Sequence, residues 1–231
     1  MIELLTALAG EPILDGALIR DDRACYTISM SRDGASTPIG VTWQTIDHID
    51  VEGRPRLRVV VHQSVNGGAF DMRDAFLLDP ETLRPVRLEN DRQGQRHVTL
   101  DYTADRVVGT RIEDGTSRPV DVALPHPVWE GNLFGVTFAA LPLAAGAAFS
   151  LPFYQYDKGL GAFSVRVTGD ETVETPDGPV DAWALEVSTG DGPPAVYLIA
   201  KADRRELGYR SARGGQALGG DCSALMTASA R

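Results

Sequence analysis

The sequence predicts a mainly β protein, an antiparallel meander sheet curved into a half-barrel or open barrel, with one short helix near residues 131–141. Three observations predict this fold. Short runs of apolar residues recur along the chain, turn residues separate them, and one alanine-rich interval changes to helical spacing. The 231 residues suit a single β-rich domain over residues 1–231, with its core at about 20–211 and peripheral termini.

The first half of the chain alternates strand-like runs with turns. One run ends at "NGG", a strong hairpin signal because Asn and Gly tolerate positive φ, and Pro80 and Pro85 bound another connection. Strands at this close spacing are typical of an antiparallel sandwich or barrel. The runs lie at 24–30, 39–51, 56–65, 69–79, 86–91, 96–102 and 106–113.

The interval from Gly131 to Ala145 breaks this rhythm. Its larger apolar residues follow a rough helical spacing with alanines between them, and Pro142 ends the pattern, so we expect a short helix packed on the sheet. A second set of strand-like runs follows at 148–156, 162–174, 180–189, 195–202 and 205–211.

Alternation within these later runs predicts which side chains face the core. Phe163, Val165 and Val167 share one face of their strand. In "VDAWALEV", the residues Asp181, Trp183, Leu185 and Val187 form the predicted core-facing set.

The charge of the chain disfavours two classes of partner. Its net charge of −10, from 22 basic and 32 acidic residues, repels nucleic-acid phosphates and anionic lipid surfaces. No segment approaches the roughly 20 apolar residues that span a bilayer. The start, "MIELLTALAGEP", lacks the basic region of a signal peptide, which predicts a cytoplasmic protein as written and a periplasmic one if an export signal was trimmed.

The two cysteines, Cys25 and Cys222, are too few for a disulfide framework or a metal cluster. Cys25 lies inside a strand-like run, where a small buried free thiol is the ordinary interpretation. A disulfide between the two is the alternative. No metal site and no cofactor are predicted.

The segment "LPHPVWEGNLFG", residues 124–135, gathers the residue types of an active site. A functional interpretation makes His126 a general base beside Glu130, with Trp129 as a cavity wall. The alternative is a strand-to-helix corner, in which two prolines hold His126 extended and Trp129 plugs the end of the barrel. The corner is favoured, because no nucleophile stands nearby and a site needs several matched roles.

Two other groups deserve the same comparison. Tyr154 and Tyr156 share one strand face, and they suit either the rim of a ligand cavity or cross-strand packing, which is favoured. His48 shares a strand face with Asp50 and Glu52, a set that could hold a divalent cation. A solvated strand edge is the favoured interpretation of this second group.

Four segments carry a resemblance to a known family. They are "FLLDPETLRPVRLE" (76–89), "VTLDYTADRVVGT" (98–110), "LPLAAG" (141–146) and "VTGDETVETPDGPVDAWALEV" (167–187). In this order they resemble a broad bacterial family of unknown function, over roughly residues 20–211. The resemblance implies a half-barrel around a short helix, distantly related to the periplasmic lipoprotein-localisation carriers that hold acyl chains in the concave face. It implies no catalytic residues.

These observations favour a non-enzymatic β-domain that binds an apolar or lipid-like ligand in its concave sheet face. The predicted ligand-binding residues are His126, Trp129, Tyr154 and Tyr156, and no catalytic residue is predicted. One alternative is a structural or assembly module that forms a homodimer or larger homo-oligomer through its sheet edges, since an open half-barrel leaves edge strands uncovered. Another is a hydrolase-like enzyme that uses His126.

Overall fold

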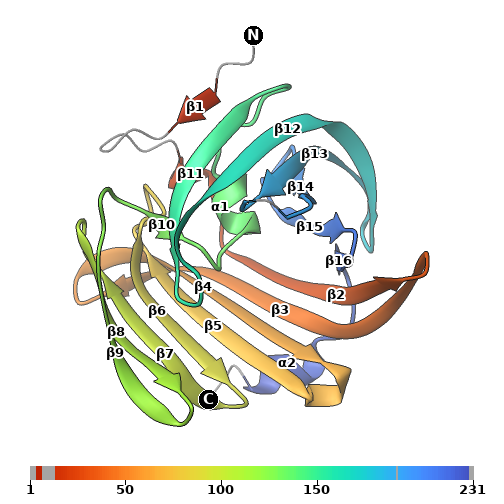
Figure 1. Cartoon of the computed structure of the whole chain (residues 1–231). Coiled ribbons are helices and arrows are strands. Elements are labelled where there is room, and N and C mark those ends of the chain that lie inside the picture. Colours follow the sequence, from red (N-terminus) through yellow and green to blue (C-terminus); the bar gives the residue numbers. More distant parts are fainter. Residues whose placement is uncertain (1–3, 7–13, 191, 229–231) are drawn as a thin grey trace.

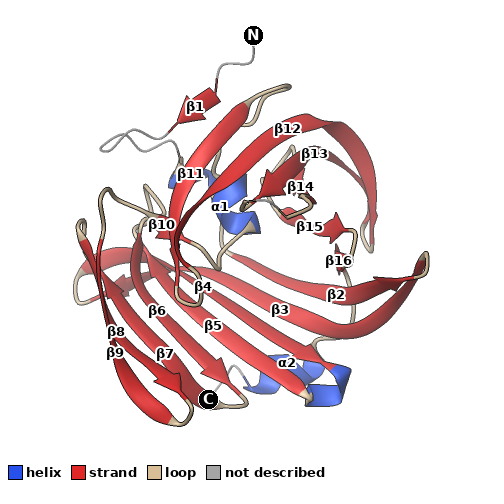
Figure 2. Ribbon diagram, viewed as in Figure 1, coloured by secondary structure: helices blue, strands red, loops and turns tan. Residues whose placement is uncertain are grey.

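The fold is known from a computed structural model that describes residues 4–6, 14–190 and 192–228. Within these residues, sixteen strands belong to one mostly antiparallel sheet. Two short α-helices and two short 3-10 helices accompany the strands. The predicted mainly β, antiparallel class is therefore confirmed (Figure 2).

The N-terminal half of the sheet is a meander in which each strand pairs antiparallel with the next strand along the chain. Tight turns join these strands, and turn residues such as Asp33 and Gly34 take positive φ values of 51° and 79°. The eight strands are β2 (Asp22–Arg32), β3 (Ala35–Val51), β4 (Arg54–Val65), β5 (Phe70–Leu78), β6 (Pro85–Arg92), β7 (Gln95–Tyr102), β8 (Arg106–Glu113) and β9 (Thr116–Ala123).

The C-terminal half is a second antiparallel meander. Two short strands, β1 (Leu4–Thr6) and β10 (Trp129–Glu130), pair parallel with its first strand. The six strands of this meander are β11 (Ala148–Gln155), β12 (Gly159–Thr175), β13 (Gly178–Ser188), β14 (Ala195–Ala200), β15 (Glu206–Ser211) and β16 (Gly214–Leu218).

The two meanders join through β16 and β2, which are distant in sequence but antiparallel neighbours in the sheet. The strand order starts at β1 and β11 and ends at β9, and these ends do not pair with each other among the described residues. The sheet is therefore open, and Figure 1 shows it curling around a central helix. This is the predicted half-barrel.

The central helix is α1 (Gly135–Ala139), which lies inside the predicted interval 131–141. All five of its residues are buried, and it packs against β14 and β15. A 3-10 helix at Asn66–Gly68 occupies the predicted "NGG" turn, and another spans Gly16–Leu18. The second α-helix, α2 (Ser223–Ala228), was not predicted.

Most buried apolar side chains form one cluster between the concave sheet face and α1. Phe163, Val165 and Val167 belong to it, as their alternation predicts. The prediction for β13 is wrong in part, because Asp181 is exposed and Trp183 only partly buried, although Leu185 and Val187 are buried. The physical reason is that the opposite face of β13 is also covered by other side chains. Its alanines join a second cluster made of Ala182, Ala184, Leu198, Ala200 and Leu207.

A disulfide joins Cys25 in β2 to Cys222, just before α2. The interpretation of Cys25 as a free thiol is therefore wrong. Cys222 and Leu225 pack on Trp43, so the end of the described chain covers β3. The prediction about an export signal concerns residues that lie largely outside the described ones. None of the described helices is long and apolar enough to cross a membrane.

Candidate functional site

The concave face is not completely filled. A cavity of about 330 Å³ remains between the segment that leads into α1 and strands from both halves of the sheet. Its wall includes three tyrosines, several amide side chains and two carboxyl groups. Among the described residues that line it there is no lysine, arginine or histidine.

The first carboxyl group is that of Glu206, the first residue of β15. It reaches the backbone of α1 at Gly135, where an added Cβ would lie only 1.9 Å from the Glu206 Oε2 atom. Only glycine leaves room for this contact. Burial raises the pKa of Glu206 to about 7, and the carboxylate has no hydrogen bond or ion pair with the described residues.

The second carboxyl group is that of Asp74 in β5, whose side chain is 4% exposed. Burial raises its pKa to about 6, although a hydrogen bond from Asn90 and the nearby Arg92 act in the opposite direction. The Asn90 Nδ2 atom donates to Asp74 Oδ1 over 2.7 Å. The cavity therefore holds two acids that ionise close to neutral pH.

Aromatic rings complete the wall. Tyr197 stacks on Tyr209 with ring centroids 5.1 Å apart and on Phe134 with centroids 6.0 Å apart. The Tyr26 hydroxyl donates to the backbone oxygen of Glu206 over 3.1 Å. Aromatic faces beside carboxylates form a surface that attracts cations.

The segment "LPHPVWEGNLFG" forms the entry to β10 and α1 and does not line this cavity before Asn132. His126 is partly buried, and its Nδ1 atom lies 3.4 Å from the backbone oxygen of Pro127. Trp129 is fully buried and donates through Nε1 to the backbone oxygen of Thr82 over 3.1 Å. The structure does not bring His126 into hydrogen-bonding contact with Glu130.

Glu130 is also fully buried. Its carboxylate accepts hydrogen bonds from the Tyr102 hydroxyl and from the backbone N–H of Asn132, the latter over 3.0 Å. Burial still raises its pKa to about 7, because desolvation outweighs these bonds. Glu130 therefore links the end of β7 to the start of the central helix.

The two predicted cavity-rim tyrosines lie in or directly after β11. Tyr154 contacts Tyr102 edge to face, and Tyr156 contacts His97 in the same way. The Tyr156 hydroxyl accepts a hydrogen bond from Arg92 over 3.2 Å. Both tyrosines are buried in the main core. Contact of His126, Trp129, Tyr154 or Tyr156 with a ligand stays a prediction.

The group around His48 lies at a strand end. His48 is exposed and its Nδ1 atom is 2.7 Å from Asp21 Oδ1. Asp50 accepts from the backbone N–H of Gly53, which supports the following turn. In the part of the chain that the structure describes, no group of three or more His, Cys, Asp or Glu residues is placed to hold a metal ion.

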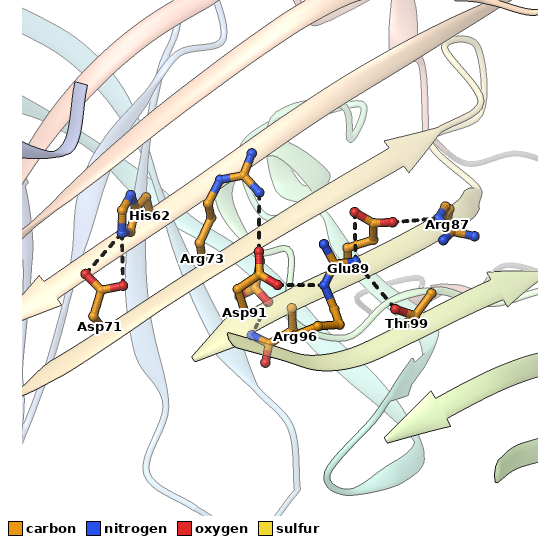
Figure 3. Close-up of polar contacts among 10 residues, drawn as sticks. His62, Asp71, Arg73, Arg87, Glu89, Asp91, Arg96 and Thr99 are labelled. Atoms are coloured by element: carbon orange, nitrogen blue, oxygen red, sulfur yellow. Dashed lines mark hydrogen bonds and ion pairs between the residues drawn. The ribbon is translucent and has the colours of Figure 1, made fainter. Parts of the chain in front are cut away.

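On the outer face of the N-terminal meander, charged side chains form ion pairs, which the two cavity acids do not. Figure 3 shows a chain of ion pairs across β5, β6 and β7, in which Arg96 contacts both Glu89 and Asp91. Arg87 also contacts Glu89, over 3.0 Å, and His62 lies 3.2 Å from Asp71. On this face each carboxylate has a basic partner, which the Glu206 carboxylate lacks.

A family described as a protein of unknown function, DUF3108, matches residues 25–212. The chain belongs to the DUF3108 family. No curated protein and no solved structure matches it. The resemblance of this DUF3108 chain to a family of unknown function is confirmed, while a bacterial origin and a relation to the lipoprotein-localisation carriers stay predictions.

Sequence reasoning missed the two cavity acids. For Asp74 a signal was available, because period-two alternation in β5 places it on the face of Phe76 and Leu78. For Glu206 it was not, because the pairing of β14 with β15 shifts register between Leu198 and Ile199. A bulge of this kind cannot be recognised from one strand alone.

Proposed function

We propose that this DUF3108 protein is a ligand-binding domain that holds a small amphipathic molecule, with a cationic head group, in the cavity beneath α1. One observation carries the proposal: the carboxylate of Glu206 reaches the cavity without a basic partner. A desolvated carboxylate is costly unless it is protonated or paired with a cation. An ammonium group in the cavity would supply that cation.

The rest of the wall fits the same ligand. The ring of Tyr209 offers a π face to a cation, and Asp74 offers a second acid. Val61, Leu133 and Phe134 supply apolar surface for the remainder of the molecule. A volume of about 330 Å³ lies at the small end of ligand cavities, which begin at about 300 Å³.

This proposal sharpens the prediction of an apolar or lipid-like ligand. A bare acyl chain in the cavity would leave the Glu206 carboxylate without a partner, which costs free energy. The head group of a cationic amphiphile supplies that partner. The disulfide between Cys25 and Cys222 also suits an oxidising compartment such as the periplasm.

The test begins with native mass spectrometry of the protein purified without detergent, followed by extraction of any retained molecule. Calorimetric titration with butylammonium to octylammonium, against the matching alcohols, then measures the preference for charge. We expect the amines to bind more tightly, and Glu206→Gln to weaken them about tenfold or more, as loss of a buried ion pair does. Asp177→Asn, which removes an exposed carboxylate from the turn between β12 and β13, serves as the control.

A second variant tests the place of binding. Gln63→Trp puts a bulky side chain into the cavity, whereas Ser64→Trp places it on the other face of the same strand. We expect only Gln63→Trp to abolish amine binding. Equal binding of amines and alcohols, or binding unchanged in Gln63→Trp, would contradict the proposal.

Assembly through the sheet edges is the weaker alternative. The edge strand β9 carries Pro119 and an ion pair from Asp121 to Arg106 of β8. Proline and charged side chains are features that discourage edge-to-edge pairing. The geometry therefore supports ligand binding more than edge assembly, and light scattering over a range of concentrations would detect a homodimer.

A further inference from the structure

A second cavity, of about 360 Å³, is lined by Pro127 and Val128 of the "LPHPVWEGNLFG" segment and shares no lining residue with the first. Three segments form it: the connection between β5 and β6, the turn after β7, and the residues that precede β10. Its apolar wall consists of Pro85, Ala104, Pro127 and Val128. Its one charged lining residue among those described is Arg84.

Arg84 is held in place by an aromatic platform. Its guanidinium carbon lies 3.5 Å from the centre of the Trp129 ring. That ring is itself fully buried and fixed by the hydrogen bond from its Nε1 atom to Thr82. Stacking on the ring face leaves the edge of the planar guanidinium, which carries its N–H donors, for another partner.

The structure provides no such partner within the described chain. The Arg84 side chain makes no ion pair or hydrogen bond with the described residues, and its Nη1 atom is buried without one. Burial lowers the pKa of Arg84 to about 10, so the side chain remains charged at neutral pH. Nearby Arg87, by contrast, is paired with both Glu89 and Asp101.

The neighbouring polar groups are already engaged. The Tyr102 hydroxyl donates to Glu130, and the Thr82 hydroxyl donates to Asp79 over 2.8 Å. The Thr103 hydroxyl lies 2.9 Å from Asp105, to which it donates. The nearest acids that precede Arg84 in sequence, Glu81 and Asp79, form no ion pair with it, and Asp79 accepts hydrogen bonds from Thr82 and from the backbone N–H of Glu81. The Glu130 carboxylate is bonded to Tyr102 and Asn132 instead. An acceptor for Arg84 must therefore come from outside the described chain.

We propose that this second cavity binds the carboxylate of a small apolar acid, with Arg84 as the anchoring cation. Because Nη1 is buried, the Nε and Nη2 atoms of Arg84 are the donors for two parallel N–H···O bonds to a carboxylate, and the apolar wall contacts the remainder of the acid. A phosphate is less suited, because its greater charge would meet a single cation in a protein of net charge −10. The site is independent of the cavity beneath α1.

The experiment is a calorimetric titration of the full chain with benzoate and with octanoate at neutral pH and low salt. We expect Arg84→Gln to weaken binding about tenfold or more. Arg84→Lys keeps the charge but not the two parallel N–H donors, and we expect it to weaken binding by a smaller factor. Arg118→Gln removes an exposed arginine from β9 and should leave affinity unchanged. Binding of the acid should also alter tryptophan fluorescence through the Arg84–Trp129 contact.

Two outcomes would overturn the proposal. One is the absence of binding of either acid to the unmodified protein at about 10 mM, which is weaker than any specific site should show. The other is equal affinity in Arg84→Gln and Arg118→Gln. Because Arg84→Lys retains the charge, it also distinguishes loss of the site from loss of folding, with thermal unfolding as the check. Gln63→Trp should leave acid binding intact, so this result is separate from that for amines.

Discussion

The two halves of the sheet fill their concave faces with different kinds of side chain. The core face of the N-terminal meander, β2–β9, is mostly aliphatic, and its outer face carries a network of ion pairs (Figure 3). In the C-terminal meander the core is a cluster of rings around Phe163, and β14, β15 and β16 are short. The N-terminal half therefore joins an aliphatic core to a charged outer face, whereas the core of the C-terminal half is built from packed rings.

The difference shows where binding groups can remain free. Asp74 comes from the N-terminal meander and Glu206 from the C-terminal one, and both line the cavity where the two meanders meet. Neither half supplies a basic residue there. The two cavity acids therefore come together only where the two meanders meet.

The largest expected effect comes from cutting the covalent link between the halves. The double variant Cys25→Ser/Cys222→Ser removes a bridge that spans 197 residues. We expect the free energy of unfolding in urea to fall by about 2–5 kcal/mol, because the unfolded chain gains freedom. Reduction of the unmodified protein should give the same loss. An unchanged stability would mean that the bridge does not hold the two halves together.

The pH dependence of stability probes the buried glutamates. Glu130 and Glu206 have pKa values raised to about 7, above those of unfolded glutamate. Their neutral forms therefore stabilise the fold below about pH 4.5, and this contribution is lost as pH rises through about 7. Between about pH 5 and 8, we expect the free energy of unfolding to fall by roughly 1–3 kcal/mol.

Matched variants assign this fall to its source. Glu130→Gln and Glu206→Gln should each reduce the difference in stability between about pH 5 and 8, since glutamine does not titrate. Asp121→Asn, at a fully exposed carboxylate whose pKa is lowered by Arg106, should not. Some fall remains in the double glutamine variant, because the raised pKa of Asp74 lies in the same range, but a fall as large as in the unmodified protein would contradict the assignment.

Equivalent phenylalanines test the packing contrast directly. Phe163 in β12 has ring neighbours at 4.4 Å (Phe153) and 5.3 Å (Phe138), whereas Phe76 in β5 is equally buried without a ring contact among the described residues. We expect Phe163→Leu to cost about 1–2 kcal/mol more than Phe76→Leu, since ring pairs add to area burial. Urea unfolding measures both. Equal costs would show that the rings act only as apolar volume.

The smallest effect concerns surface charge. Arg96→Gln breaks contacts with both Glu89 and Asp91, whereas Arg210→Gln in the other half breaks a single pair with Glu171. We expect a loss of about 0.5–1 kcal/mol for Arg96→Gln and less for Arg210→Gln, because exposed pairs contribute little outside a network. Repeating the unfolding in high salt should diminish both losses. A larger loss for Arg210→Gln would reverse the comparison.

The strands of the N-terminal meander were largely predictable, because the residue types in their turns favour the turn conformations that the structure contains. Asp33-Gly34 and Asp114-Gly115 both take positive φ at the tips of hairpins, as these residue types favour. The strand β16, "GGQAL", has no strand signal of its own, and its place follows from pairing with β2. A glycine-rich segment of this kind forms a strand only when a distant partner is in place.

The candidate sites were less predictable for the same reason. Asp74 could be placed by alternation, but the contact of Arg84 with Trp129 joins two separate connections of the fold. The residues that sequence reasoning chose, such as Trp129 and Tyr154, are conspicuous types that the structure buries in the core. A residue type indicates what chemistry is available, whereas the tertiary fold decides which groups are left without partners.

The pairing of β2 with β16 also determines how long one edge of β2 stays unpaired during biosynthesis. β2 is among the first strands to leave the ribosome, yet its partner on one side is encoded close to the end of the chain, as is the cysteine that it binds 197 residues later. At about 5–20 residues per second, that interval lasts roughly 10–40 s. Throughout it, the nascent chain presents one unpaired edge of β2, so the time of greatest exposure to mispairing falls before synthesis is complete.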